Sequence, residues 1–330
     1  MTRRAFVLGS GQIGRAVALA LLEDGWSVTC AQRTRSGMPL ELTTRGISRL
    51  QLDREDDATL QDALGSGFDA VVDTVAFNAA HGRQWAKLAG KIGALAVIST
   101  GSVYADASGH TLDEGATNGY PDYGGPISED CCRTPAGDAT YSTRKVALED
   151  ALQEEFSRPL TILRPFAVYG PGNIAPREWW FVTRGLAGMT AIPLAYGGQS
   201  RFHTSATANI AELCRIAVQV GGSHILNAAD PECLTVMEIG RALLDAMGSG
   251  AVLEPLEGPP RDLASWTPWT IPAPLIADMS AAAALGYRPV TDFRSAARDT
   301  VDHLTRAAKG RHWLEAFPGL GAYPAAMFEK

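Results

Sequence analysis

Cysteine is scarce in this 330-residue sequence, and its few occurrences form no pattern. Their number is odd, and no two have the C-x-x-C spacing of a redox or zinc motif. This argues against a disulfide framework and a structural zinc site, and we expect no metal and a reducing compartment. The cysteines are Cys30, Cys131, Cys132, Cys214 and Cys233.

Long hydrophobic runs are also lacking. The first apolar stretch follows M-T-R-R, is broken at Gly9, and is too short for the core of a signal peptide. No later run approaches the ~20 apolar residues that a membrane-spanning helix needs. We therefore expect a cytoplasmic protein with no membrane partner.

Positive charge is in deficit. The chain has 29 Lys and Arg against 36 Asp and Glu, a formal net charge of −7, with no basic cluster. Nucleic-acid binding depends on neutralising phosphates, so we expect no nucleic-acid partner. A composition that is 46% hydrophobic and 20% charged indicates a folded protein, and the length suggests about two domains of ~150 residues each.

Short β-type runs alternate with helical stretches in the first part of the chain, which is typical of a parallel sheet covered by helices on both faces. Residues 104–139 are rich in Gly, Asp, Pro and Ser, which predicts a lid or substrate loop. The alternation lapses near Gly170, where a second lobe is expected. The expected strands are 5–8, 26–31, 70–75, 94–99 and 160–163, and the expected helices are 15–24, 58–64, 84–92 and 141–156.

A glycine-rich segment, G-S-G-Q-I-G, lies between the first expected strand and helix. It fits G-x-G-x-x-G, in which glycines allow a tight turn, close approach of a pyrophosphate and helix-strand packing. The helix N-terminus adds free N–H donors. We therefore predict an α/β, Rossmann-type doubly wound parallel sheet that binds a dinucleotide, with a smaller C-terminal substrate-binding lobe. The predicted contacts are Gly9, Gly11, Gln12, Ile13 and Gly14.

The end of the second expected strand bears on the choice of dinucleotide. An acidic residue there would bind the adenosine ribose 2′-hydroxyl, but Gln32 occupies the place and is followed by Arg33 and Arg35. A guanidinium binds a 2′-phosphate through its planar fork. This favours NADP(H), with NAD(H) as the alternative if the arginines are simply solvated loop residues.

Two further polar residues follow expected strands. Asp53 comes after Leu50 and Leu52, where the adenine edge is expected to lie. Asn78 follows the strand at 70–75 and would lie near the nicotinamide half of the cofactor, although an Asn in a turn needs no function.

Tyr141 and Lys145 are four residues apart on an expected helix and so share one of its faces. A nearby cation favours phenolate and lowers the pKa of a tyrosine from about 10, which allows proton exchange nearer neutrality. Alone, this spacing only suggests acid-base chemistry.

Two other segments supply context: I-S-T-G-S-V-Y at 98–104 and L-R-P-F-A-V-Y-G-P-G at 163–172. Together with Y-S-T-R-K at 141–145, they resemble the extended or atypical branch of the short-chain dehydrogenase/reductase superfamily, often labelled the NAD-dependent epimerase/dehydratase family. The resemblance covers roughly residues 5 to 290. Extended members usually carry G-x-x-G-x-x-G, whereas Leu8 stands where a further glycine often precedes the motif, which places the chain nearer the atypical members.

The resemblance implies specific roles. Tyr141 would be the general acid/base, Lys145 would bind the nicotinamide ribose and lower the pKa of Tyr141, and Thr100 would hydrogen-bond the substrate oxygen. Pro165 would border the cofactor, and Ser102, Tyr104 and Arg201 would contact substrate. An arginine near Arg201 often binds a diphosphate in nucleotide-sugar members; the alternative here is a plain surface arginine. The family is often dimeric, so a homodimer is expected.

These observations leave three functional hypotheses. The first is an NADP(H)-dependent ketoreductase or dehydrogenase acting on a sugar-like or nucleotide-sugar secondary alcohol or ketone. The alternative is an NAD(P)-dependent sugar epimerase that retains its cofactor. A non-catalytic dinucleotide sensor or RNA-associated protein is a third. A 4,6-dehydratase is disfavoured, because such members carry Asp-Glu after the catalytic Thr, whereas Gly101 and Ser102 follow Thr100. We expect a Rossmann domain at 1–169 plus about 204–228 and a substrate-binding lobe at 170–203 plus 229–330.

Overall fold

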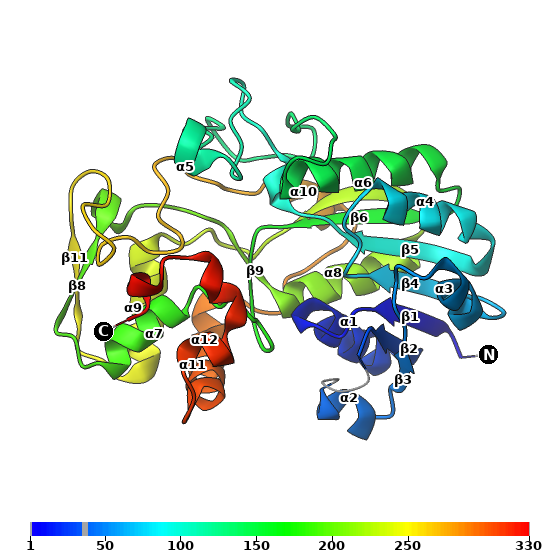
Figure 1. Ribbon diagram of the computed structural model, residues 1–330, viewed down its shortest axis with the longest axis horizontal. Helices are drawn as coiled ribbons and strands as arrows, with labels where there is room; N and C mark the ends of the chain where they lie inside the picture. The colour runs from blue at the N-terminus through cyan, green and yellow to red at the C-terminus, as the bar shows by residue number, and fades with distance from the viewer. Residues whose placement is uncertain (1, 35–38, 330) are drawn as a thin grey trace.

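A seven-stranded parallel sheet forms the larger lobe of the computed structural model, which describes residues 2–34 and 39–329 (Figure 1). The strand order is β10-β6-β5-β4-β1-β2-β3. All neighbours run parallel, so their carboxyl ends meet at one edge of the sheet. The strands are β1 (Arg4–Leu8), β2 (Ser27–Gln32), β3 (Ser48–Gln51), β4 (Phe68–Asp73), β5 (Ile92–Ile98), β6 (Leu160–Pro165) and β10 (Ser223–Ala228).

Helices cover both faces of this sheet because the central strands are apolar on both sides. One face packs against α1 (Gln12–Glu23), α2 (Leu40–Thr44), α8 (Thr207–Val220) and α10 (Ser280–Ala284). The other packs against α3 (Asp57–Leu64), α4 (Ala79–Lys87) and α6 (Tyr141–Glu155). This arrangement confirms the predicted Rossmann-type doubly wound α/β fold.

The C-terminal lobe has its own core, in which buried aromatic side chains pack together. Trp180 and Trp269 have almost no exposed surface, and Phe181 lies between them. The strand pairs are β8 (Ala191–Leu194) with β11 (Val252–Pro255) and β7 (Ala167–Tyr169) with β9 (Thr204–Ala206). The helices are α7 (Trp179–Leu186), α9 (Val236–Met247), α11 (Phe293–Ala308) and α12 (Trp313–Ala316), with short 3-10 turns at Ala195–Gly198, Pro318–Ala322 and Ala325–Met327.

Some elements differ from the expectations. The helix expected at 84–92 lies at Ala79–Lys87, because the Asn78 side chain caps its start and Ile92 already begins β5. β3 was not expected, since an edge strand of sequence S-R-L-Q lacks an apolar run. The loop at 104–139 contains one short helix, α5 (Gly115–Asn118). Both cores cross the expected division into domains. Ala282 and Tyr287 pack in the sheet core although they fall in the range assigned to the second lobe, and Ala167 and Tyr169 pack in the core of the C-terminal lobe.

Among residues 2–34 and 39–329, no helix has both the length and the apolar character needed to cross a bilayer. Within the same residues, no three His, Cys, Asp or Glu side chains come together as candidate metal ligands.

Candidate active site

The glycine-rich turn after β1 has the shape that a pyrophosphate requires. Gly9 adopts φ +104°, and a Cβ there would lie 2.3 Å from the Thr74 Oγ1. A Cβ on Gly14 would lie 1.9 Å from the carbonyl oxygen of Gly9, so these two positions close the turn tightly. Gly11, by contrast, faces open space. α1 begins at Gln12 and Ile13 with no side-chain cap, so its first N–H groups are free to bind phosphate. The turn therefore fits a dinucleotide.

The carboxyl end of β2 carries no carboxylate among the described residues. The Gln32 amide accepts a hydrogen bond from the Ser10 hydroxyl and donates one to the carbonyl oxygen of Thr34. Arg33 is exposed beside it, and Arg35 lies outside the described residues. Asp53 is exposed just beyond β3 and accepts a hydrogen bond from the Glu55 N–H at 3.1 Å. A cation, rather than an anion, thus stands where β2 ends.

Three side chains predicted to be catalytic come together at the ends of β4, β5 and α6. Thr100 follows β5 directly and caps the 3-10 turn Gly101–Val103, accepting from the Ser102 N–H at 3.1 Å. Tyr141 is the first residue of α6, where the Thr140 side chain caps the helix. The Lys145 Nζ lies 5.8 Å from the centre of the Tyr141 ring. One turn of α6 therefore places the phenol and the ammonium on the same side, next to Thr100.

The Lys145 side chain is buried, with 5% of its surface exposed, and backbone carbonyl oxygens accept its hydrogen bonds. Its Nζ donates to the carbonyl oxygens of Ala76 at 2.7 Å and Ile98 at 2.8 Å. Burial lowers the pKa of Lys145 to about 8, while the carboxylates of Asp73 and Glu149 oppose this shift. An ammonium has three donors, so one remains for a ligand hydroxyl.

Tyr141 is 43% exposed, yet burial of its phenol raises the pKa of the group. A hydrogen bond with Thr100 acts in the opposite direction, and the nearby charge of Asp113 raises the pKa further. Asp113 lies in the long loop and accepts a hydrogen bond from the Ser142 N–H at 2.8 Å. Sequence reasoning missed Asp113, because a lone acid in a Gly- and Asp-rich loop carries no motif.

The remaining predicted site residues lie in different settings. Asn78 accepts from the His81 N–H and so has a capping role at α4. Ser102 is half-buried next to Thr100, and Pro165 is buried at the end of β6. Arg201 is exposed and donates to the carbonyl oxygen of Cys233 at 2.9 Å.

Tyr104 is fully buried. Its hydroxyl donates to the Asn227 Oδ1 at 2.7 Å and accepts from Arg164 at 3.0 Å, and burial raises its pKa. These contacts give Tyr104 a place in the packing beneath the site, and with no exposed surface it is not part of the substrate site that we propose below.

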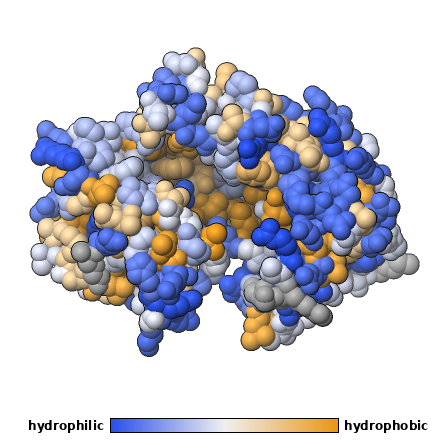
Figure 2. All heavy atoms as spheres, viewed as in Figure 1, coloured by the Kyte–Doolittle hydropathy of each residue, from blue (hydrophilic) through white to orange (hydrophobic). Residues whose placement is uncertain are grey.

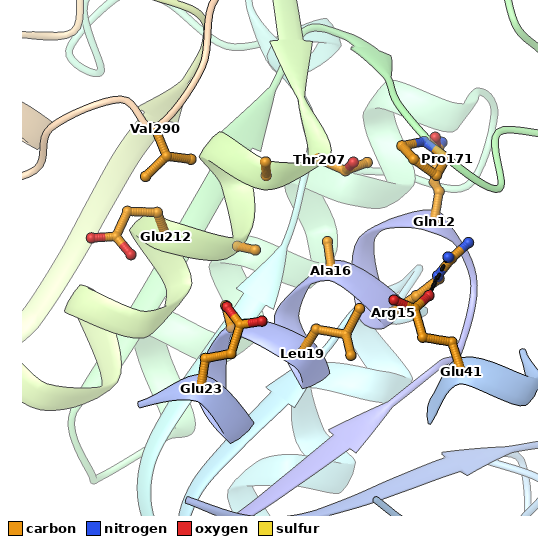
Figure 3. Close-up of a pocket in the computed structure, with 13 residues that line it drawn as sticks. Gln12, Arg15, Ala16, Leu19, Glu23, Glu41, Pro171, Thr207, Glu212 and Val290 are labelled. Carbon is orange, nitrogen blue, oxygen red and sulfur yellow. Dashed lines mark hydrogen bonds and ion pairs between the residues drawn. The ribbon is translucent and has the colours of Figure 1, made fainter. Parts of the chain in front are cut away.

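A hollow with apolar walls separates the two lobes in Figure 2. A second cavity, of about 420 Å³, lies between α1 and α8 (Figure 3). The glycine-rich turn and the following turn of the Y-G-P-G segment meet at one of its ends, where Gln12 and Pro171 are neighbours. Arg15 and Glu41 form an ion pair on its wall.

Comparisons with known proteins agree with this fold. The model of the NAD dependent epimerase/dehydratase family matches residues 5–228. A search of curated protein sequences gives no significant match. The structure is similar to the enzyme WbmH of Bordetella bronchiseptica, solved in complex with NAD+, at 21% identity and a TM-score of 0.70, covering 93% of this chain and 99% of that one.

Two epimerases are also similar in structure. UDP-glucose 4-epimerase from Thermus thermophilus, solved with NAD, gives 20% identity and a TM-score of 0.67 over 92% of this chain and 99% of that one. UDP-N-acetylglucosamine 4-epimerase from Methanobrevibacter ruminantium gives 19% identity and a TM-score of 0.71, again over 92% and 99%. At these identities the likeness shows the fold alone. Because the family model spans most of the chain, the protein belongs to the NAD dependent epimerase/dehydratase family. It is thus an NAD(P)-dependent enzyme of the short-chain dehydrogenase/reductase type.

Proposed function

We propose that this protein is an NADP(H)-dependent oxidoreductase that interconverts a secondary alcohol and a ketone on a sugar-like substrate. The observation that carries the proposal is the grouping of Thr100, Tyr141 and Lys145 beside a glycine-rich turn that fits a dinucleotide. A proton donor next to a hydride carrier is what alcohol-ketone chemistry needs.

The side chains have distinct roles in this proposal. The bound nicotinamide supplies or accepts the hydride. Tyr141 gives a proton to the carbonyl oxygen in reduction, or removes it from the hydroxyl in oxidation. Thr100 holds that oxygen by a hydrogen bond. Lys145 binds the nicotinamide ribose with its remaining donor and, once the site is filled, favours the phenolate of Tyr141 by its charge.

Further residues bind the dinucleotide in this proposal. Gly9, Gly11, Gln12, Ile13 and Gly14 hold the pyrophosphate, and Asp53 lies at the adenine. Asn78 and Pro165 border the nicotinamide half through their backbone, since the Asn78 side chain caps α4. We assign the dinucleotide to residues 1–169 plus about 204–228 and the substrate to the rest of the chain, with two copies forming a dimer.

The preference for NADP(H) rests on the end of β2, where Arg33 is exposed and the described residues 32–34 include no carboxylate that would repel a 2′-phosphate. Titration calorimetry should show tighter binding of NADPH than of NADH. Arg33→Ala should reduce that difference by roughly 1–3 kcal/mol, as expected for a charge-assisted hydrogen bond. Arg298→Ala, an exposed arginine on α11, should leave the difference unchanged. Equal affinities for the two dinucleotides in the unmodified protein would refute the preference.

A sugar epimerase is the second candidate, favoured by the two 4-epimerases of similar fold. An epimerase keeps its cofactor through oxidation and reduction, whereas a reductase releases it in each turnover. We expect the purified protein to be largely free of dinucleotide and to consume added NADPH with a keto sugar. If it carries tightly bound dinucleotide and interconverts two stereoisomers without added cofactor, the epimerase is the correct assignment.

The substrate side of the proposal places Ser102 at the reacting end and Arg201 farther out. Arg201 would bind a diphosphate if the substrate carries a nucleotide. Turnover of a free sugar and of its nucleotide-linked form can be compared to test this. Arg201→Ala should raise KM only for the nucleotide-linked substrate.

A further inference from the structure

The turn after β7 lies directly against the glycine-rich turn. A side chain at Gly172 would begin 3.6 Å from the Gln12 Cα, and Gly172 has φ +85°, a conformation that favours glycine. The Gln12 amide oxygen next to this turn is buried and has no hydrogen-bond partner in the described part of the chain. Figure 3 shows Pro171 beside Gln12. Residues 170–172 therefore cover the first residue of α1, where the dinucleotide phosphates are expected.

The C-terminal lobe holds this turn from the other side. The Gly172 N–H donates to the Nε2 of His303, in the middle of α11, at 3.2 Å. The turn is also fixed at its base, because Gly170 adopts φ +128° and packs so closely on Thr207 that a Cβ would lie 2.3 Å from its Oγ1. The contact with His303 differs from the packing on Thr207, because the imidazole can change its charge with pH.

Electrostatics keep this contact formed near neutral pH. Nε2 accepts a hydrogen bond only when the imidazole is neutral with its proton on Nδ1. Burial lowers the pKa of His303, and the charges of Arg15 on α1 and Arg306 on α11 lower it further. Arg15 is in turn paired with Glu41 of α2. A proton on Nε2 would place one donor against another and break the contact.

We propose that His303 is a positioning residue that holds the 170–172 turn over the dinucleotide phosphates and thereby sets the rate at which the dinucleotide leaves. This rests on the proposed function. The 170–172 turn lies between α11 and the glycine-rich turn. In this proposal, the dinucleotide can leave only after the Gly172–His303 contact breaks.

Stopped-flow displacement of NADPH from the full-length protein tests this role. His303→Leu removes the acceptor and should accelerate release roughly fivefold, the loss of about one hydrogen bond. His303→Gln places an amide oxygen at a similar reach and should retain a release rate close to that of the unmodified protein. The exposed Arg298→Gln on the same helix is the control and should change nothing.

The dependence on pH separates positioning from simple packing. As pH falls from 8 to 5, release from the unmodified protein should accelerate, because His303 gains a proton, whereas release from His303→Gln should show less acceleration. The 2′-phosphate of NADPH also titrates near pH 6, so the comparison between the two proteins, repeated with NADH, isolates the imidazole.

Two failures can be told apart. If the unmodified protein binds neither dinucleotide, the proposed function is refuted and this inference with it. If the unmodified protein binds but His303→Leu releases NADPH at the same rate, only the role of His303 is overturned. Equal pH dependence in the unmodified protein and His303→Gln would also overturn it.

Discussion

The two lobes bury polar groups in different ways. In the sheet lobe, Glu149 has no exposed surface and binds Arg164, Arg133 and the Ser99 hydroxyl. In the C-terminal lobe, Glu178 is 2% exposed and its main electrostatic partner is its neighbour Arg177. Four indole N–H groups there, those of Trp179, Trp180, Trp269 and Trp313, are buried without a partner among the described residues. The sheet lobe thus pairs its buried charges close to the proposed active site, whereas the C-terminal lobe is built by aromatic packing.

The largest expected effect lies in the sheet lobe. Tyr141→Phe removes the proton partner while it leaves the dinucleotide site intact, so turnover should fall by a factor of order 10²–10⁴. Steady-state kinetics and titration calorimetry measure the two quantities separately, and dinucleotide affinity should stay nearly constant. If Tyr141→Phe is fully active, a group other than Tyr141 transfers the proton. Lys145→Met should weaken both turnover and dinucleotide binding; unchanged binding would contradict its role at the ribose.

A pair of tryptophan substitutions compares the lobes directly. Trp85 and Trp180 both have 0% exposure, but the Trp85 Nε1 donates to the Asp73 carboxylate at 2.7 Å. Trp85→Phe and Trp180→Phe should each lower the free energy of unfolding by about 2 kcal/mol, measured by urea denaturation. Only Trp85→Phe should also change dinucleotide affinity, because Asp73 supports the charge of Lys145. If both substitutions change dinucleotide affinity equally, the buried hydrogen bond of Trp85 does not set the sheet lobe apart.

The burial of Glu178 should make the free energy of unfolding depend on pH. Burial raises its pKa to about 7 from an ordinary value of 4.5. The protonated carboxyl therefore contributes stability below pH 4.5, which is lost as pH rises to 7. Relative to the unmodified protein, Glu178→Gln should gain about 2–3 kcal/mol in the free energy of unfolding between these pH values. The exposed Glu257→Gln is the control. A constant difference across this range would contradict the burial of a charge at Glu178.

The smallest expected effect concerns Asp113. Asp113→Asn keeps an acceptor for the Ser142 N–H but removes a charge that raises the pKa of Tyr141. The limb of the kcat/KM profile that reports Tyr141 should move to lower pH, with little change in the maximum. Glu114→Gln, an exposed neighbour, should leave the profile in place. If the limb of the kcat/KM profile stays at the same pH in Asp113→Asn, Asp113 does not influence the pKa of Tyr141.

How well a feature could be predicted depends on whether its partners are close in the sequence. Runs such as Ala-Leu-Ala-Val-Ile in β5 predict a buried strand because both faces are apolar. β3 has no such run. The roles expected of Thr100 and Tyr141 come from the resemblance of their motifs to a known family, and the structure places these residues after β5 and at the start of α6. The burial of Tyr104 depends on Arg164 and Asn227, which are distant in sequence, and the contact of His303 with Gly172 joins residues 131 positions apart. Local periodicity contains no information about such partners.

The pairing of β6 with β10 has a consequence for how the chain folds. Residues 166–222, including α7 and the strands β8 and β9, intervene between these neighbouring strands. Until β10 has been synthesised, β6 is an open sheet edge with buried-type side chains, which favours association with other chains. The large sequence separation of this contact also slows folding. We therefore expect truncations that end before Ser223 to aggregate, although they contain Thr100, Tyr141 and Lys145.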